Sequence, residues 1–292
     1  MGNIAQGRNY GNINIGVCEM IGQHDLLQEW HDLVAINKFP RFSILVGPVG
    51  SGKKTICNLL AKQMGLVLNV YGTGVEDVRN MIQSARTVAT PILYVIPDAD
   101  KMSLSAKNAL LKLTEEPPRA AYVIITVTNL SSLLGTIRSR GTVFYMSPYS
   151  AKDISEYCVG KYSPEDKVLR IICSVCETPG EVDMMMSSNP EKFYSDVEKV
   201  VDHIATVSGA NAFKMAQMLH LKESDTGKYD VGLFLKIFTT ICSSRVARSP
   251  VKYIAGVRCA SKYLQELRIT GINKASTIDM FILDIRKAWM EA

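Results

Sequence analysis

The sequence predicts an α/β domain, a parallel sheet with helices on both faces, followed by an all-helical part. Three observations predict this. In the first half, short apolar segments alternate with segments of helical spacing, which is the order of a parallel sheet with crossover helices. Beyond residue 150, no segment has the character of a strand bounded by turns. From about residue 191, the chain shows longer amphipathic helical patterns.

The elements of the first half follow one another in a regular order. Residues 23–36 have apolar positions at helical spacing, and the short buried strand "RFSILVG" then leads into a glycine-rich turn. Three further strands are expected in "LVLNVY", "PILYVI" and "AAYVIITVT", and helices in "SGKKTICNLLAKQMG", "GVEDVRNMIQSART" and "SAKNALLKLTEE". Gly65 and the pair Pro117-Pro118 are helix stops. The alternation ends near residues 144–150.

The second half predicts helices only. Three short ones are expected in "AKDISEYCVGKY", "PEDKVLRIICSVCE" and "PGEVDMMMSS", with Pro164 and Pro179 near helix starts. Four longer ones are expected in "EKFYSDVEKVVDHIATV", "DVGLFLKIFTTICSSRVA", "VKYIAGVRCASKYLQEL" and "ASTIDMFILDIRKAW". We therefore expect three domains, at residues 1–148, 149–190 and 191–292.

Composition limits the class of protein. The 292 residues exceed one core of ordinary size, and 47% hydrophobic with 21% charged residues is usual for a soluble globular protein. No apolar run reaches bilayer length and the polar N-terminus lacks a signal core, so we expect a cytoplasmic protein with no membrane partner. The net charge of +5 permits a nucleic-acid partner without requiring one. Cys173 and Cys176 form a C-x-x-C without a second pair, which predicts packing residues and no zinc.

The stretch "GPVGSGKKT", residues 47–55, departs at one position from the phosphate-binding pattern G-x-x-x-x-G-K-[ST]. A strand, a glycine-rich turn and a helix place backbone N–H groups and the helix dipole against phosphates, so ATP or ADP is the expected ligand. Lys53 is expected at the β- and γ-phosphates, whereas Lys54 stands where a magnesium-binding hydroxyl belongs. The candidate nucleotide-binding residues here are Gly47, Gly50, Gly52, Lys53, Lys54 and Thr55.

The segment "PDADKMSLSAKNALLKLTEEPP" resembles the Walker B region of AAA+ clamp-loader subunits, whose pattern runs from D-E-A-D-K-M to N-A-L-L-K-x-L-E-E-P-P. The segments "IGQHDLLQEW", "GVEDVRNMIQSAR" and "TNLSSLLGTIRSRG" resemble the family's opening segment, its G-V-D-D-I-R helix and its sensor 1 region. The C-terminal "LRITGINKASTIDMFILDIRKAW" is similar to the end of the collar domain in bacterial delta-prime and gamma subunits. The resemblance, to a bacterial or phage DNA polymerase III delta-prime or gamma/tau-like subunit, covers nearly the whole chain. It implies a AAA+ domain, a helical lid and a helical collar.

The same resemblance implies an altered catalytic site. The family's metal-binding Asp aligns with Pro97 and its catalytic Glu with Asp98, so Lys54 and Pro97 hold the two magnesium-ligand positions and metal binding stays open. Thr55 is turned about 100° from the ligand position on a helix and is a poor substitute. The sensor 1 region adds Asn129 to the nucleotide-binding candidates.

Two further motifs of the family, one in the lid and one after sensor 1, have counterparts in this chain. The lid stretch "ETPGEVDMMM" contains acidic residues and no sensor 2 arginine. The family's S-R-C motif, which supplies an arginine finger to the adjacent subunit, corresponds to Ser139-Arg140-Gly141. Arg140 is therefore the candidate finger and Arg138 the weaker one. The zinc module that many relatives carry before the Walker B strand is absent, since residues 58–96 contain no Cys.

DNA contact is the least specific expectation. The basic residues in question lie on or next to the helix that follows the Walker B segment. In clamp loaders the corresponding face follows the DNA backbone through phosphate contacts, although a solvated helix face explains these charges equally well. The candidates are Lys101, Lys107, Lys112 and Arg119.

We therefore expect a clamp-loader subunit that hydrolyses ATP weakly or not at all and donates Arg140 to a neighbour. Its expected partners are other clamp-loader subunits in a hetero-oligomeric ring, a sliding clamp and primer-template DNA. Two alternatives remain: an active clamp-loader ATPase with shifted metal ligands, and an AAA+ helicase loader or regulator, against which the collar-like C-terminus argues.

Overall fold

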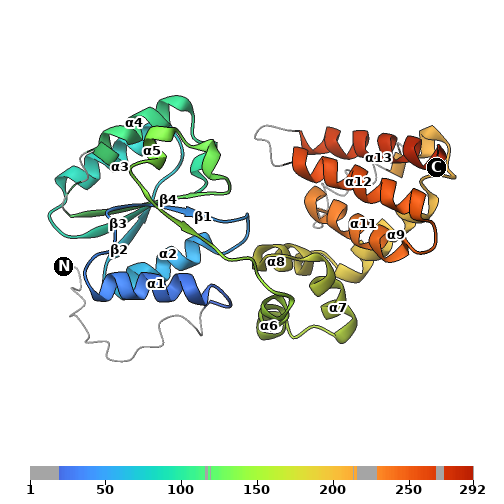
Figure 1. Ribbon diagram of the computed structural model, residues 1–292, viewed down its shortest axis with the longest axis horizontal. Coiled ribbons are helices and arrows are strands. Elements are labelled where there is room, and N and C mark those ends of the chain that lie inside the picture. Colours follow the sequence, from blue (N-terminus) through green and yellow to red (C-terminus); the bar gives the residue numbers. More distant parts are fainter. Residues whose placement is uncertain are drawn as a thin grey trace. The chain divides into compact units, whose positions relative to one another are not determined.

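The computed structural model describes residues 20–115, 118, 120–212, 214–215, 229–267 and 273–291 (Figure 1). The chain divides into two compact units, Met1–Asp153 and Ile154–Ala292. The three-domain division expected from the sequence stays a prediction.

The first unit alternates strands and helices as the sequence predicts. Its helices are α1 (His24–Ala35), α2 (Lys53–Met64), α3 (Val75–Thr87), α4 (Leu104–Glu115) and α5 (Gly135–Arg138), with 3-10 turns η1 (Ala99–Lys101) and η2 (Leu130–Ser132). Its strands are β1 (Phe42–Val46), β2 (Val67–Val70), β3 (Ile92–Ile96), β4 (Ala121–Val127) and β5 (Thr142–Tyr145).

The five strands form one parallel sheet in the order β2-β3-β4-β1-β5. The parallel α/β sheet predicted from the sequence is confirmed. The sequence prediction named four strands and missed β5, which is four residues long and has Phe144 as its one buried side chain. This strand pairs with β1 from Ser43↔Thr142 onward, so it fixes the segment just before it at the edge where β1 begins.

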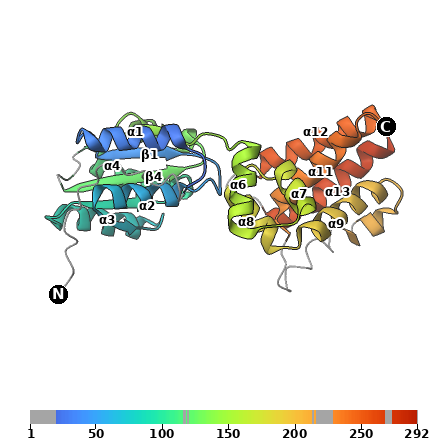
Figure 2. The same cartoon turned by 90° about the horizontal axis from the view of Figure 1, so that it is seen from below.

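Helices cover both faces of the sheet (Figures 1 and 2). Successive strand residues point to opposite faces, so Leu45 faces α1 and α2 while Ile44 faces α3, α4 and α5. On the first face Trp30 packs edge-on against Phe144. The two apolar layers are built wholly from residues of this unit, so the loops at the strand ends are positioned by a packed core.

The second unit contains helices only, as far as the structure describes it. They are α6 (Ala151–Tyr162), which begins in the first unit, α7 (Asp166–Val175), α8 (Pro179–Ser187), α9 (Pro190–His203), α11 (Val231–Arg245), α12 (Pro250–Glu266) and α13 (Lys274–Met290). Its aromatic core joins Phe238 of α11 edge-on to Phe281 of α13 and stacks it on Trp289. Among the described residues, no helix combines the length and the apolar content needed to span a bilayer.

Candidate nucleotide site and interface arginine

The glycine-rich loop joins the end of β1 to the start of α2. Gly50 and Gly52 have φ angles of 77° and 86°, in the left-handed region that favours glycine. The Gly47 N–H donates to the Val127 carbonyl at 3.0 Å, and a Cβ on Gly47 would lie 3.0 Å from Ser51 Oγ. The predicted glycines therefore occupy positions where a side chain would strain or crowd the loop.

Lys53 closes this loop from within. Its Nζ donates to the carbonyls of Gly47, at 2.7 Å, and of Pro48, at 2.8 Å, and the residue is only 7% exposed. Burial lowers the pKa of Lys53 from its ordinary value, while the nearby carboxylates of Asp98 and Asp100 act in the opposite direction. Lys53 is thus bonded to the glycine-rich loop and lies near the acidic residues after β3, and a role for these residues in binding a nucleotide stays a prediction.

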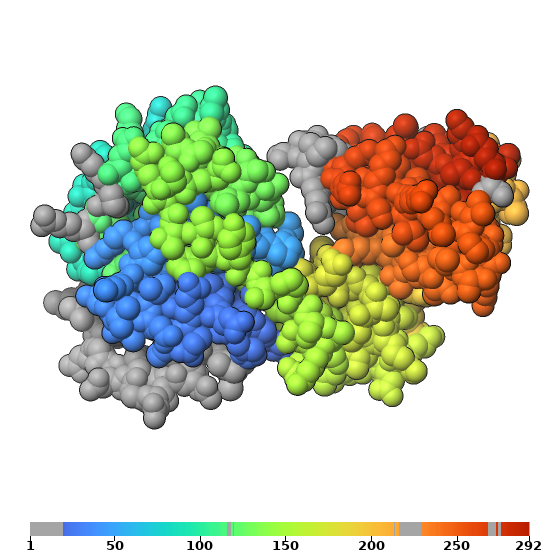
Figure 3. Space-filling view, viewed as in Figure 1, coloured from blue at the N-terminus to red at the C-terminus, as the bar shows by residue number. Residues whose placement is uncertain are grey.

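Two contacts that the sequence prediction missed hold the loop from the side. Gln23, left-handed at φ 61° and buried, donates through Nε2 to the Ser147 carbonyl at 2.7 Å and accepts from the Ser147 N–H at 2.7 Å. The Tyr149 hydroxyl donates to the Ser51 carbonyl at 2.7 Å. The segment after β5 therefore lies against the chain around α1 and the loop, and in the space-filling view the light-green and blue surfaces meet (Figure 3). The segment "IGQ", which ends at Gln23, was the sequence signal that could have indicated the Gln23 contact.

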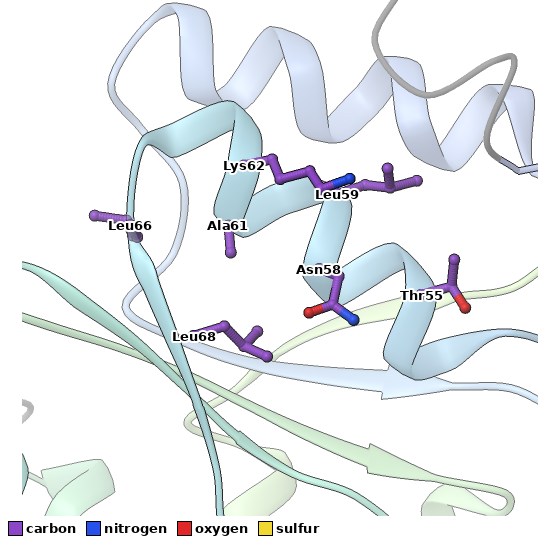
Figure 4. Close-up of a pocket in the computed structure, with 7 residues that line it drawn as sticks. All are labelled: Thr55, Asn58, Leu59, Ala61, Lys62, Leu66 and Leu68. Carbon is purple, nitrogen blue, oxygen red and sulfur yellow. The ribbon is translucent and has the colours of Figure 1, made fainter. Parts of the chain in front are cut away.

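Lys54 and Thr55 point away from the buried side of α2. Both are exposed, and Lys54 forms no hydrogen bond or ion pair with any described residue. Thr55 lines a hollow of about 380 Å³ beside α2 and β2, together with Asn58, Leu59, Ala61, Lys62, Leu66 and Leu68 (Figure 4). Lys54 therefore lies in the first turn of α2 with its ammonium available.

The turn after β3 carries the two acidic residues of the Walker B segment. Asp98 has a left-handed backbone (φ 52°), and its N–H donates to Thr126 Oγ1 at 3.2 Å. Its carboxylate accepts from Lys101 at 2.9 Å. Asp100 Oδ2 accepts from Thr128 Oγ1 at 2.8 Å, and its Oδ1 is buried without a hydrogen bond to any described residue. The sequence prediction missed Thr126 and Thr128, which orient this turn from β4 and the residue after it.

These residues fit the phosphates of a nucleotide better than they fit magnesium. Left-handed glycines, a helix N-terminus and a buried lysine form a cradle for phosphate oxygens. Magnesium requires oxygen ligands in near-octahedral geometry. Lys54 and Pro97 offer none, and Asp98 is already paired with Lys101. The donor set therefore does not match a magnesium site of the usual kind.

Asn129 lies just after β4 and has a local role in the structure. Its Oδ1 accepts from the N–H of Ser131 at 2.9 Å and from the Ser131 hydroxyl at 2.8 Å, which caps η2. A contact from Asn129 to a nucleotide stays a prediction.

Arg140 and the glycine-rich loop lie at opposite edges of the sheet along the strand direction. Arg140 lies at the edge where β1 begins, and the loop lies at the edge where β1 ends. Arg140 precedes β5, which pairs with the beginning of β1, whereas the loop follows the end of β1. Four residues of strand separate these edges by about 13 Å, beyond the reach of one arginine side chain. The guanidinium donates to the Thr136 carbonyl at 2.9 Å and pairs with Glu115 at 3.5 Å, and the side chain is 37% exposed. Arg138, the weaker candidate, is also exposed.

Gly141, where the resembling family has Cys, is explained by packing. A Cβ at this position would lie 2.8 Å from Ile44 and 2.9 Å from Phe42. Both side chains are buried in β1. The space that a cysteine side chain would need is therefore filled by side chains of β1.

The lysines proposed to contact DNA differ in their surroundings. Lys101 pairs with Asp98, and Lys107 donates to the Ser132 carbonyl at 2.8 Å. Lys112 is exposed on α4 and pairs with no described residue. Arg119 lies outside the described residues. The structure thus leaves Lys112 as the described lysine of this set whose ammonium is unengaged.

The acidic lid residues have partners in their own unit. Glu181 accepts from Lys236 of α11 at 2.7 Å, and Thr178 caps α8 by accepting from the Glu181 N–H. Asp183 accepts from the hydroxyls of Tyr157 and Tyr162 and from Lys161 at 2.9 Å. The two carboxylates that the sequence places in this stretch, Glu181 and Asp183, are therefore paired with lysines of their own unit.

The cysteines of the C-x-x-C lie at the end of α7. Cys176 is buried and Cys173 partly so, and burial raises the pKa of the Cys176 thiol to about 12. No group of three metal-ligating side chains exists among the described residues. The surroundings of Cys176 favour the packing role predicted for it.

Comparisons with known proteins agree with this geometry. A family model described as "DNA polymerase III, delta subunit" matches residues 72–150. DNA polymerase III subunit tau of Bacillus subtilis is 24% identical over 247 residues, which is 70% of this chain and 43% of the relative. A replication factor C small subunit of Sulfolobus acidocaldarius is 27% identical over 150 residues, or 47% of this chain and 46% of the relative. The chain spans about half the length of these curated relatives.

One solved structure has the same fold over nearly its whole length. It is a DNA polymerase III gamma subunit-related protein from Thermotoga maritima, with a TM-score of 0.51 and 18% identity, covering 90% of this chain and 99% of that one. The parallel sheet, the helical second unit and the matched motifs support the same assignment. In sequence and in fold, this chain is related to the AAA+ subunits of clamp loaders.

Proposed function

We propose that this protein is a clamp-loader subunit of a DNA replication machine, which hydrolyses ATP weakly or not at all and donates Arg140 to a neighbouring subunit. Its partners are other clamp-loader subunits in a hetero-oligomeric ring, a sliding clamp and primer-template DNA. Relatives that carry DNA polymerase III and replication factor C names support the class of assembly.

The observation that carries the proposal is the place of Arg140. It lies about 13 Å or more from the glycine-rich loop of its own chain, because β1 separates the two edges. Its two restraints are a backbone carbonyl and a partly exposed carboxylate, both of which an exposed arginine can leave. An arginine presents a planar fork of donors that suits a phosphoryl group. Arg140 is therefore equipped for a nucleotide held by another subunit.

The altered loop supports the second half of the proposal. Phosphoryl transfer in P-loop ATPases needs a metal ion that is held by the hydroxyl of the loop and by the acidic residue of the Walker B strand. Lys54 and Pro97 replace these, and Asp98 is paired with Lys101. An active ATPase with shifted ligands is the alternative, and it would rest on Asp100, whose Oδ1 has no hydrogen bond to a described residue.

The test is to measure ATP turnover by the isolated chain and by the partner subunits with and without it. We expect the chain alone to turn over far below about 1 per second, the low end of ordinary enzymes, and to stimulate the partners when it assembles with them. Magnesium-dependent turnover of the isolated chain at an ordinary rate would favour the alternative. Failure to associate with clamp-loader subunits or a clamp would favour a helicase loader or regulator.

A further inference from the structure

We propose that this protein binds an adenine nucleotide without magnesium, and that Lys54 supplies at the phosphates the positive charge which a metal ion would otherwise supply. The inference rests on the AAA+ subunit proposed above and defines the ligand state of its own loop.

The charges at the start of α2 indicate an anionic ligand. Lys53 and Lys54 are the first two residues of this helix, and its first turn contains no acidic residue. Cations near a helix N-terminus oppose the helix dipole, and anions are favoured there. The pair of lysines is therefore unfavourable in the empty loop and becomes favourable when a phosphate chain lies against it.

The two lysines are held differently, which separates their roles. Lys53 is buried and donates to the carbonyls of Gly47 and Pro48, so it belongs to the loop itself. Lys54 is exposed and pairs with no described residue. Its ammonium is free to turn toward the phosphates without breaking an existing contact.

Lys54 also works against a metal ion directly. A magnesium ion in the usual place would meet an ammonium instead of a hydroxyl oxygen, and two like charges in contact repel. The opposite ligand position is Pro97, which has no side-chain donor. Asp98 has its carboxylate 2.9 Å from Lys101, and Asp100 is held by Thr128. Occupation by a lysine ammonium and occupation by magnesium are therefore alternatives at this loop, and the sequence contains the lysine.

The experiment is equilibrium binding of ATP and of ADP to residues 1–292, by calorimetry, in buffer with excess EDTA and in buffer with excess magnesium. We expect affinities equal within a factor of about two in the two buffers. Lys54→Gln, which removes the charge and keeps most of the length, should weaken binding in EDTA by about tenfold or more, because a hydrogen bond to a charged group is lost. Lys54→Arg should retain most of the affinity.

The matched control is Lys62→Gln, which removes the same charge from the other end of α2, about 12 Å away, and should not change binding. Thermal unfolding of each variant shows whether the fold is intact. Binding by the wild type that requires magnesium, or unchanged binding by Lys54→Gln in EDTA, would overturn the inference. A chain that binds neither nucleotide also overturns it but leaves the Arg140 proposal standing, because that proposal is measured on the assembled complex.

Discussion

Arg140 and Glu115 form an ion pair in which Nη2 lies 3.5 Å from Oε1, and this pair joins the segment before β5 to the last residue of α4. Both side chains are partly exposed, so the pair contributes at most about 1 kcal/mol to the free energy of unfolding. An arginine held this weakly can turn to a nucleotide on a neighbouring subunit with little loss of stability.

The first prediction concerns Glu115. Glu115→Gln should change the free energy of unfolding by less than about 0.5 kcal/mol, and should leave the ATPase rate of the assembled complex equal or raised, since Arg140 is released. Chemical denaturation and complex ATPase are the measurements, with Glu76→Gln, which breaks the exposed Arg79 pair, as control. A marked fall in complex ATPase would mean that Glu115 positions Arg140.

The second prediction concerns the packing of Gly141. Gly141→Ala should lower the free energy of unfolding by about 1–3 kcal/mol, because the added Cβ meets Ile44 and Phe42 in a packed core. Gly160→Ala is the control: it lies within α6 with nothing within 4 Å, and should raise stability by up to about 1 kcal/mol. If both substitutions change the free energy of unfolding in the same direction, the close contact between position 141 and β1 is not the reason for the glycine there.

The third prediction restores the metal ligands. Pro97→Asp together with Lys54→Thr should make nucleotide binding depend on magnesium, because a hydroxyl and a carboxylate then stand at the two ligand positions. Calorimetry in EDTA and in magnesium measures this, with each single change as control. If the double variant binds equally in both buffers, the loss of metal binding has another cause.

The fourth prediction concerns the two units. Residues 1–150 should fold alone, because both apolar layers around the sheet are made from residues 20–146. Residues 1–130, which lack Ile137 and Phe144, should be insoluble. We expect residues 151–292 to carry the association with partner subunits. Circular dichroism, thermal unfolding and co-purification test these fragments, and co-purification of residues 1–150 with the partners would place the assembly surface in the first unit.

The fifth prediction concerns Asp183. Asp183→Asn should lower the free energy of unfolding by about 1–2 kcal/mol, because two hydroxyls and an ammonium lose a charged acceptor. Hydrogen bonds to Tyr157 and Asp183 raise the pKa of Lys161 above its ordinary value of 10.5. A group whose pKa is raised in the folded state contributes fully to the free energy of unfolding below its unfolded pKa, and this contribution is lost as pH rises through its folded pKa. The effect of the substitution should therefore be full at pH 8 and shrink above pH 10.5, and a constant difference in denaturation across that range would contradict it.

Local patterns were enough to predict the parallel sheet and the glycine-rich loop, since alternation and glycine spacing act over a few residues. They missed β5, because a four-residue strand with one buried side chain has too short a pattern. They also missed the two hydrogen bonds between Gln23 and Ser147, which are 124 positions apart, and the ion pair between Glu181 and Lys236, which are 55 positions apart. Such contacts exist only once the chain has folded.

The measurement that tests the account most directly is the ATPase rate of the assembled complex, with clamp and primed DNA, for wild type, Arg140→Ala and Arg138→Ala at matched assembly. An arginine finger accelerates phosphoryl transfer by roughly 10³–10⁵ in related systems, so Arg140→Ala should lower the rate of the site it serves by a large factor. The stability and nucleotide affinity of the isolated chain should be unchanged, Arg140→Lys should restore little, and Arg138→Ala should behave as wild type. An unchanged rate for Arg140→Ala would contradict the account and leave this chain a structural member of the ring.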